Sequence, residues 1–488
     1  MYIPSTLYRF TMKPWSRYNT LFLSARNGWF LYNALSGIML ELDEAHYRIA
    51  CSLRDAKQLS SGDIDSGFME LLEKKGILAE RQDEQLKLMV SRYQRNATCF
   101  STATLSLTIC PTLACNFACP YCFEHSQNDE TIMRDETIAA LAEFIKQHHD
   151  ARTLTVSWYG GEATLAFDII ERLTKEFIEL YPDYDNAGMV TNAYLLDQDK
   201  IERLKALKIT SIQITLDGSE ATHNKRRMLK NGGATYERIL HNIDLLMNSS
   251  WEGSCAIRVN VDKTNQEEYA ALHTELLERY KGKDLSVYPG YVNTFEGHGY
   301  SDQCGFDNSD RAAFTLNQYQ KEGIIPKNGF FPGSGVHNTC VATNHYFYVV
   351  SPNGELYKCW EDVGQAQRAI GSVHEDEFVT NPELVAHYSI GTDPFNDSGC
   401  IACRVLPICG GGCVRKRLRA QHYGEKGIDY CSPLKESLTD YLDAYIDTWQ
   451  TKQICDEVLG KGGAPSMEQG YRMVQPEEKE GEADTMLS

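Results

Sequence analysis

The spacing of seven cysteines in the last third of this 488-residue chain constrains its fold more than any other feature of the sequence. Little regular hydrophobic periodicity lies between them. A segment of this kind is typically organised by bound metal rather than by an apolar core. The seven cysteines are Cys340, Cys359, Cys400, Cys403, Cys409, Cys413 and Cys431.

The expected role of the many thiols depends on whether the protein is secreted or remains in the reducing cytoplasm. Residues 1–9 lack the basic stretch, long apolar run and small-residue cleavage site of a signal peptide. No run of about 18 apolar residues is present that would predict a membrane span. We therefore expect a cytoplasmic protein that binds no membrane and whose sixteen cysteines serve metal or redox chemistry rather than disulfides. The net charge of −19 argues against a nucleic-acid-binding surface.

A second, shorter group of cysteines follows an apolar segment at 104–109. Cys115, Cys119 and Cys122 are separated by three and two residues. Three thiolates in one loop can hold three irons of a [4Fe–4S] cluster, which leaves the fourth iron without a protein ligand. A partial zinc site is the alternative, because zinc also favours cysteine.

Between residues 100 and 296, apolar segments alternate with helical ones. This alternation predicts parallel βαβ units, and six of them make an open, partial (β/α)6 barrel in an α/β fold. In parallel barrels the chemistry lies in the loops that follow the strands, which is where the three-cysteine loop is found. Strands are expected at 104–109, 154–158, 187–191, 211–216, 256–261 and 285–288, and helices at 135–149, 169–180, 199–205 and 236–249.

The remaining segments divide around the predicted barrel. Residues 1–95 predict a small winged-helix-like domain, with strands at 18–23 and 29–32, helices at 38–54 and 63–75, and a closing strand at 77–79. The other expected boundaries are 100–296 for the barrel, 297–339 for an irregular bridge, 340–435 for the cysteine-rich domain, 436–460 for a C-terminal helix and 461–488 for a disordered tail.

The three-cysteine loop, with Tyr121 directly before its last cysteine, resembles the signature of the radical S-adenosylmethionine (SAM) superfamily. The resemblance implies a [4Fe–4S] cluster whose open iron binds SAM and passes one electron to it. Methionine and a 5′-deoxyadenosyl radical would form, and the radical would abstract a hydrogen atom from a substrate. On this interpretation Cys115, Cys119 and Cys122 are the catalytic ligands and Tyr121 belongs to the SAM site.

One strand later comes Gly160-Gly161-Glu162, which resembles the SAM-binding element of the same family. The resemblance implies that the two glycines let the backbone approach the methionine group of SAM. It also implies that the carboxylate of Glu162 contacts the ammonium. Ala163 stands where the family usually has proline.

Two later strand ends carry weaker indications. Asn192 follows the third predicted strand, and Thr215-Leu216-Asp217-Gly218 after the fourth resembles a Ser-Leu-Asp-Gly element of peptide-modifying relatives. The resemblance implies that Asn192, Thr215 and Asp217 contact the SAM carboxylate or ribose. A helix cap and turn explain the same residues equally well. Four further polar residues are open to the same two interpretations: His223, Arg226, Arg258 and Asn260.

The seven later cysteines resemble the SPASM extension of radical SAM enzymes that modify peptides and proteins. The resemblance implies two auxiliary [4Fe–4S] clusters, and hence three clusters in the chain. Auxiliary cluster I would be held by Cys340, Cys359 and Cys413. Auxiliary cluster II would be held by Cys400, Cys403, Cys409 and Cys431. Cluster I lacks a fourth thiol, since Tyr346 stands near the place of one in some relatives; its iron is then open to a substrate thiolate, or it borrows Cys304, Cys110 or another distant thiol.

These resemblances together predict a RiPP maturase, a radical SAM/SPASM enzyme that modifies a ribosomally synthesised precursor peptide. Residues 1–95 resemble a recognition element that binds the leader of the precursor as an added strand at an exposed sheet edge. The expected product is a thioether from a cysteine sulfur to a carbon, as in ranthipeptides and sactipeptides, and a carbon–carbon crosslink is the nearest alternative. The expected protein partner is an electron donor such as flavodoxin or ferredoxin.

Two other functions remain open on the sequence. Anaerobic sulfatase-maturing enzymes, which form formylglycine, resemble this chain from the three-cysteine loop onward, but tend to place an acidic base directly after the second auxiliary cysteine. Here Cys359 is followed by Trp360, and acids appear only at Glu361 and Asp362. A non-catalytic, metal-stabilised binding protein would hold zinc in place of iron and would not cleave SAM.

Overall fold

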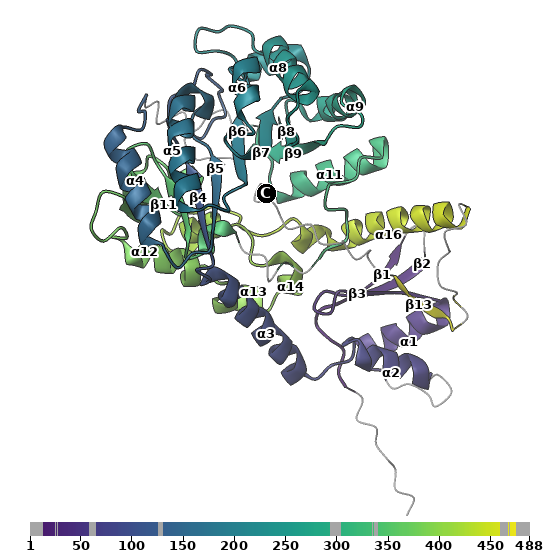
Figure 1. Cartoon of the computed structure of the whole chain (residues 1–488). Coiled ribbons are helices and arrows are strands. Elements are labelled where there is room, and N and C mark those ends of the chain that lie inside the picture. The colour runs from purple at the N-terminus through teal and green to yellow at the C-terminus, as the bar shows by residue number, and fades with distance from the viewer. Residues whose placement is uncertain are drawn as a thin grey trace, which may run out of the picture.

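The computed structural model of the chain, drawn in Figure 1, describes residues 13–24, 26, 28–57, 65–124, 130–292, 304–333, 335, 340–458, 467 and 469–474. Within these residues the strands form one sheet of nine strands and another of four. The large sheet carries the three-cysteine loop, and the small sheet is built mainly from the N-terminal part of the chain. None of the described helices is both long and apolar enough to cross a membrane.

The strands β4 to β9 are parallel and form the continuous centre of the large sheet. Helices alternate with them along the chain and cover the sheet from outside (Figure 1). The predicted α/β fold with a parallel sheet is therefore confirmed. The strands are β4 (Thr104–Ile109), β5 (Thr153–Trp158), β6 (Ala187–Thr191), β7 (Ile209–Thr215), β8 (Ser254–Val261) and β9 (Leu285–Tyr291). The helices are α4 (Asp135–Gln147), α5 (Phe167–Leu180), α6 (Gln198–Arg203), α7 (Glu220–Arg226), α8 (Tyr236–Asn248) and α9 (Tyr269–Arg279).

The central strands are covered on both faces, and their sequences reflect this. In β4 the alternate residues Leu105, Leu107 and Ile109 are buried, and so are Ser106 and Thr108 between them. Strands buried on both faces appear as continuous apolar runs rather than as alternating patterns. For this reason the strand expected at 104–109 coincides with β4.

Three short strands extend the large sheet beyond β4. They are β10 (Phe347–Val350), β11 (Glu355–Tyr357) and β12 (Gly371–Ser372). β10 runs parallel to β4, with Phe347 opposite Ser106 and Val350 opposite Ile109, and β11 and β12 follow in antiparallel pairs. The cysteine-rich segment is thus joined to the parallel strands by backbone hydrogen bonds. The sequence predicted no strands here, because such short ones show no periodic pattern.

The small sheet is antiparallel and has the order β1-β2-β3-β13. Its strands are β1 (Asn19–Ser24), β2 (Gly28–Asn33), β3 (Ile38–Leu42) and β13 (Tyr471–Val474), and the nearby helices are α1 (Glu44–Arg54), α2 (Ser66–Lys74) and α3 (Arg81–Cys99). The helix expected at 38–54 is wrong in its first part, because 38–42 form β3. The helix begins only after Asp43, whose carboxylate accepts a hydrogen bond from His46 N at 2.8 Å. The strand expected at 77–79 is reduced to a bridge between Leu78 and Trp15.

Two segments expected to be irregular contain regular structure. In the bridge 297–339, Asn308–Glu322 form α11, which begins with a capping box. In the tail 461–488, which we expected to be disordered, residues 471–474 form β13. The partner of this strand is remote in the sequence, since the paired Arg472 and Glu41 are 431 positions apart. Residues 461–466, 468 and 475–488 of that tail lie outside the described residues.

The C-terminal helix α16 (Leu434–Val458) packs the small sheet against the cysteine-rich segment. On one face of the sheet, Leu31 packs in a cluster with Phe68 of α2. On the other face, Phe30 shares an apolar cluster with Leu442 of α16 and with residues 405–408, which lie among the cysteines. The small sheet is therefore covered on both of its faces.

Replacing Leu442 by alanine tests whether this cluster stabilises the molecule. Leu442 is fully buried, and loss of its side chain should lower the free energy of unfolding by about 2–5 kcal/mol. Anaerobic urea denaturation followed by circular dichroism makes the measurement. Leu86→Ala is the control, because Leu86 is 59% exposed; equal midpoints for the two variants would contradict the prediction.

Candidate functional site

The three-cysteine loop follows β4 at the carboxyl end of the parallel strands, the position expected of a barrel site. Its backbone is fixed to the segment after α7, because Ala118 N donates to Met228 O at 2.9 Å. Cys115 and Cys122 are partly buried, and Cys119 is 8% exposed. The three thiols are thus presented by one loop that is anchored to rigid elements.

Gly160 and Gly161, after β5, lie directly against this loop. Gly161 N donates to Thr112 O at 3.2 Å. A Cβ atom at Gly161 would lie 2.3 Å from Leu113 O and 2.4 Å from Ala114 O, and Gly160 has a φ of +115°. The two glycines therefore allow two loops to pack backbone against backbone, a reason for glycine that does not depend on SAM.

Glu162 is a buried carboxylate that pairs with no basic side chain among the described residues. Its Oε1 accepts hydrogen bonds from Thr164 Oγ1 at 2.5 Å and from Thr191 Oγ1 at 2.6 Å. Its Oε2 accepts one from Asn192 N at 2.6 Å, which leaves acceptor capacity on this oxygen. A buried carboxylate without a cation is costly, so the site fits a ligand that brings a positive charge.

A network of buried charges joins the cysteine loop to the ends of β7 and β8. The hydroxyl of Tyr121 donates to Asp217 and accepts from Arg227 NH1 at 2.9 Å. Arg226 bridges two carboxylates, with Nε 3.4 Å from Asp217 Oδ2 and NH1 2.7 Å from Asp262 Oδ2. Tyr121 is thereby held in one orientation within the loop.

His223 positions the turn that carries Asp217. It is fully buried, and its Nδ1 accepts a hydrogen bond from Asp217 N at 3.1 Å, so that Nε2 carries the proton and donates to Thr235 Oγ1 at 3.1 Å. Burial, together with Arg227 and Arg226, lowers the pKa of His223 well below its ordinary value. The neutral imidazole favours the cap-and-turn interpretation for this residue.

The structure brings most of the predicted SAM contacts together. Tyr121 is bonded to Asp217, and Asn192 is bonded both to Glu162 and, through Nδ2, to Asn116 Oδ1 of the cysteine loop at 2.8 Å. Thr215 pairs with β8, and within the described residues no side-chain hydrogen bond joins it to the loop. The roles of all these residues toward SAM stay predictions.

Sequence reasoning missed Arg227 and Asn116. Each has a buried nitrogen without a hydrogen-bond partner in the described part of the chain, Nε in Arg227 and Nδ2 in Asn116. Arg227 is close enough to Cys119 to oppose the rise in its pKa that burial causes. Unused donors beside the thiols fit an anionic ligand. In the sequence, Arg227 was marked only by its place in an Arg-Arg pair, and such residues are usually exposed.

Nine of the ten cysteines of the two sequence motifs influence one another's pKa, and they do so within three groups. In the first, burial and then Glu162 and Cys119 raise the pKa of Cys115 to about 12. Burial and then Glu124 and Cys119 raise the pKa of Cys122 to about 12. Metal ligation needs thiolates, which burial disfavours unless a cation joins them. The loop therefore fits a bound metal centre.

The second group is formed by Cys340, which precedes β10, Cys359, which follows β11, and Cys413. Burial raises the pKa of Cys359 well above its ordinary value, Asp362 and Glu361 add to this rise, and Cys340 contributes as well. After burial, Cys413 is a further cause of the raised pKa of Cys340. These are the three residues predicted for auxiliary cluster I, and their ligation stays a prediction.

The third group comprises Cys400, Cys409 and Cys431, and Cys403 packs beside the same apolar cluster as Cys400 and Cys409. Burial raises the pKa of Cys400 and of Cys431, and Cys409 adds to both. Arg417 NH2 donates to Cys400 Sγ at 3.0 Å, and Lys435 Nζ lies 3.7 Å from Cys431 Sγ. Basic neighbours stabilise thiolates, the form that binds iron. With Cys403, this group is the set predicted for auxiliary cluster II, and its ligation stays a prediction.

The two thiols offered as a fourth ligand of cluster I lie in different regions of the large sheet. Cys110 follows β4 and is fully buried in an apolar cluster with Val349 and Tyr357. Burial raises its pKa well above the ordinary value. Cys304 lies beside the end of β8, where its carbonyl accepts from Lys263 N at 3.0 Å.

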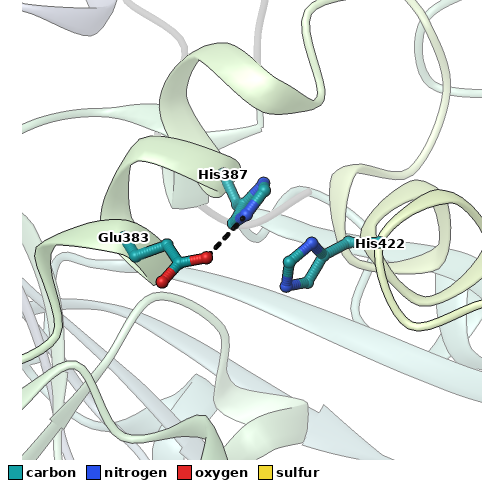
Figure 2. Close-up of side chains that lie close together, drawn as sticks. All are labelled: Glu383, His387 and His422. Carbon is teal, nitrogen blue, oxygen red and sulfur yellow. Dashed lines mark ion pairs between the residues drawn. The ribbon is translucent and has the colours of Figure 1, made fainter.

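Figure 2 shows a further group of potential metal ligands, Glu383, His387 and His422, on the cysteine-rich segment. The two imidazole centroids are 3.6 Å apart, and Glu383 Oε1 lies 3.7 Å from His387 Nε2. Metal-binding histidines almost always donate their second ring N–H to a fixed acceptor. Within the described ranges neither histidine has such an acceptor, and Glu383 and His422 are exposed. The thiols therefore stay the predicted metal ligands of the chain.

Comparison with known proteins agrees with this prediction. The model of the radical SAM superfamily matches residues 109–276. The chain is similar to the serine-type anaerobic sulfatase-maturating enzyme of Klebsiella aerogenes, with 25% identity over 330 residues that cover 62% of this chain and 77% of the relative. It is also similar to the cysteine-type anaerobic sulfatase-maturating enzyme of Clostridium perfringens (strain 13 / Type A), with 25% identity over 373 residues that cover 68% of this chain and 95% of the relative.

Solved structures share the fold. Native anSMEcpe with bound AdoMet (SAM) and Cp18Cys peptide matches with a TM-score of 0.52 and 19% identity, over 71% of this chain and 98% of that chain. Streptococcus suis SuiB bound to precursor peptide SuiA matches with a TM-score of 0.50 and 19% identity, over 86% of this chain and 98% of that chain. The radical SAM superfamily model thus matches the part of the chain that holds the three-cysteine loop and the strands from the end of β4 to β8.

Proposed function

We propose that the chain is a radical SAM enzyme that modifies a polypeptide, with a SAM-binding [4Fe–4S] cluster on the three-cysteine loop and two auxiliary clusters on the cysteine-rich segment. The observation that carries the proposal is the place of the three-cysteine loop, which follows β4 at the carboxyl end of the parallel strands and lies beside Glu162, whose backbone N donates to Ala114 O at 2.9 Å. Zinc would fit the four thiols predicted for auxiliary cluster II. It would not explain a buried carboxylate without a cation next to the three-cysteine loop.

The residues around the first thiol group would bind and orient SAM. When bound, SAM and a reduced cluster supply a carbon radical that takes a hydrogen atom from the substrate, and auxiliary clusters supply an acceptor for an electron. The free acceptor capacity of Glu162 suits the ammonium of SAM. The unused nitrogens of Arg227 and Asn116 suit its carboxylate. Tyr121, held by Asp217, would border the same ligand.

The known relatives support a polypeptide as substrate. The curated relatives are named sulfatase-maturating enzymes, and the solved structures contain a Cp18Cys peptide in one case and the precursor peptide SuiA in the other. We extend this to a ribosomally made precursor, whose leader would bind the N-terminal sheet by adding a strand to its edge. A flavodoxin or ferredoxin would supply the reducing electron.

The surroundings of Cys359 favour crosslinking over formylglycine formation. Asp362 is buried and accepts hydrogen bonds from Arg415 Nε at 2.6 Å and from the Tyr388 hydroxyl. Glu361 accepts from Arg415 NH1 at 2.8 Å. A general base must be within reach of the proton that it takes, and these ion pairs hold both acids away from that task. We therefore propose thioether formation, and formylglycine formation is the second candidate because the curated relatives are named for sulfatase maturation.

Replacing Cys115, Cys119 and Cys122 together by alanine should remove one cluster and leave two. Iron in the anaerobically reconstituted protein should fall from about twelve to about eight per chain, since each cluster holds four irons, and SAM cleavage should cease. Iron analysis and chromatography of 5′-deoxyadenosine make the measurement. Cys51→Ala is the control, because Cys51 lies outside the three groups. Cleavage at the parent rate in the triple variant would refute the assignment, and zinc in place of iron would favour a binding protein.

Replacing Glu162 by glutamine keeps the size of the side chain and removes its charge. SAM should bind about 10- to 100-fold more weakly, because a charge-assisted hydrogen bond of about 1.5–3 kcal/mol is lost. Equilibrium binding of SAM to the cluster-loaded protein is measured beside Glu136→Gln, since Glu136 is exposed. Equal affinities in the two variants at equal iron content would exclude this role for Glu162.

Product analysis separates the two candidate reactions. The assay uses a synthetic cysteine-containing peptide, treated anaerobically with SAM and reductant. Thioether formation removes from the peptide a hydrogen atom from carbon, a proton from the thiol and one electron. The cysteine sulfur is then no longer a free thiol and resists alkylation. Formylglycine instead leaves an aldehyde that reacts with a hydrazide. We expect resistance to alkylation, and an aldehyde would favour the second candidate.

A further inference from the structure

The chain's own C-terminal residues fill one edge of the small sheet. β13 pairs antiparallel with β3, from Tyr471 opposite Leu42 to Val474 opposite Met39 (Figure 1). The strand at the other edge, β1, contacts α16, because Ser24 donates a hydrogen bond to Asp443. The β3 edge is thus the place at which the sheet accepts a further strand, and an internal segment occupies it.

Two side chains of β13 enter apolar surroundings. The Tyr471 ring packs against the His46 ring of α1, with centroids 5.3 Å apart, and against the Phe68 ring of α2, with centroids 5.1 Å apart. Val474, three residues later, is 1% exposed and belongs to the cluster that includes Met39 and Leu442. The edge therefore offers an aromatic site at one end and an aliphatic site at the other.

A charge pair lies between these two sites. Arg472 Nε donates to Glu41 Oε2 at 2.6 Å, and the Arg472 guanidinium lies 5.2 Å from the Trp449 ring of α16. Oppositely charged residues that lie directly opposite each other on neighbouring strands stabilise the pairing, and like charges there destabilise it. Glu41 therefore selects a basic residue at this position of the added strand.

The turn before β13 is adapted to this docking. Asp43 N donates to Gly470 O at 2.7 Å. Gly470 has a φ of +76°, and a Cβ atom there would lie 2.4 Å from Asp43 Oδ2 and 2.6 Å from His46 Nδ1. A residue with a side chain would be strained at this φ and would collide with both neighbours. The short strand thus depends on one glycine.

We propose that the β3 edge is a peptide-binding site and that residues 471–474 are its resting occupant, which the peptide substrate displaces. This inference rests on the proposed function, because it identifies the partner as an extended segment of the polypeptide substrate. The chemistry of that segment follows β13: an aromatic residue for His46 and Phe68, then a basic residue opposite Glu41, and an aliphatic residue two positions further on. The chain would thus exclude peptides that lack this pattern.

The internal strand is a displaceable occupant. Each cross-strand pair contributes only about 0.2–1 kcal/mol, and β13 has four residues against the five of β3. Its advantage is attachment to the same chain, which gives it an effective concentration in the mM range. A free peptide with the same pattern that pairs along all of β3 gains contacts that β13 lacks. It can therefore compete.

The test uses the full-length, cluster-loaded protein and a fluorescently labelled synthetic peptide with the sequence of residues 467–476. Arg472→Glu places like charges opposite Glu41 and should release β13, so the peptide should bind at least about tenfold more tightly than to the unchanged chain, by fluorescence anisotropy. The double variant Glu41→Arg, Arg472→Glu restores the internal pair and should lose this gain. Arg81→Glu is the matched control, since Arg81 is exposed on α3.

Three results would overturn the inference: equal peptide affinity in the unchanged and Arg472→Glu chains, equal gain in Arg81→Glu, or full gain in the charge-swapped double variant. Gly470→Val releases the strand by a different route and should reproduce the gain, with faster amide hydrogen exchange over residues 38–42 until peptide is added. SAM cleavage is measured in the same samples. Failure of cleavage contradicts the proposed function, whereas failure of peptide binding with cleavage intact contradicts this inference alone.

Discussion

The pairing of β4 with a parallel strand on each side is the constraint on which the rest of the structure depends. On one side, β5 brings Gly160 and Gly161 against the cysteine loop that follows β4. On the other, β10 brings in the segment that carries the second and third thiol groups, and the ladder continues past β4 through Cys110 N and Val350 O at 2.9 Å. One strand thus positions thiols from distant parts of the chain.

The charges around the first thiol group are incompletely balanced by the protein. Arg226 is shared between Asp217 and Asp262, whereas Glu162 pairs with no described basic residue and Arg227 has an unused nitrogen. Burial of such groups costs several kcal/mol each. A ligand with an ammonium, a carboxylate and a cationic metal centre would compensate them together, and by binding only the folded chain it would stabilise the fold. The charges that would attract such a ligand are the same charges whose burial costs the protein free energy.

The small sheet packs against the cysteine-rich segment. Its inner face shares an apolar cluster with α16 and residues 405–408, and α3 is tied to the same segment because Arg92 Nε donates to Asp393 at 2.9 Å. Removal of residues 1–95 would expose this cluster and disturb the third thiol group. Substitutions at Glu41 or Arg472 change the charge pair at the edge of the sheet and leave Phe30 and Leu442 of that cluster in place.

Local patterns were sufficient for the parallel strands, the cysteine motifs and the glycine pair, because each is encoded by residues close together in the sequence: apolar runs, short thiol spacings and Gly-Gly-Glu. The ligand sets of the two auxiliary clusters came from a family resemblance, since spacing alone does not say which distant thiols meet. Tertiary pairing decided the remainder. Residues 38–42 are a strand because β2 and β13 flank them, and residues 471–474 are ordered because β3 is their partner. Arg227 reaches the site through its contact with Tyr121, and Asp362 is held in an ion pair by Arg415. No local sequence pattern predicts these contacts. Burial and charge pairing depend on which remote segments the fold brings together.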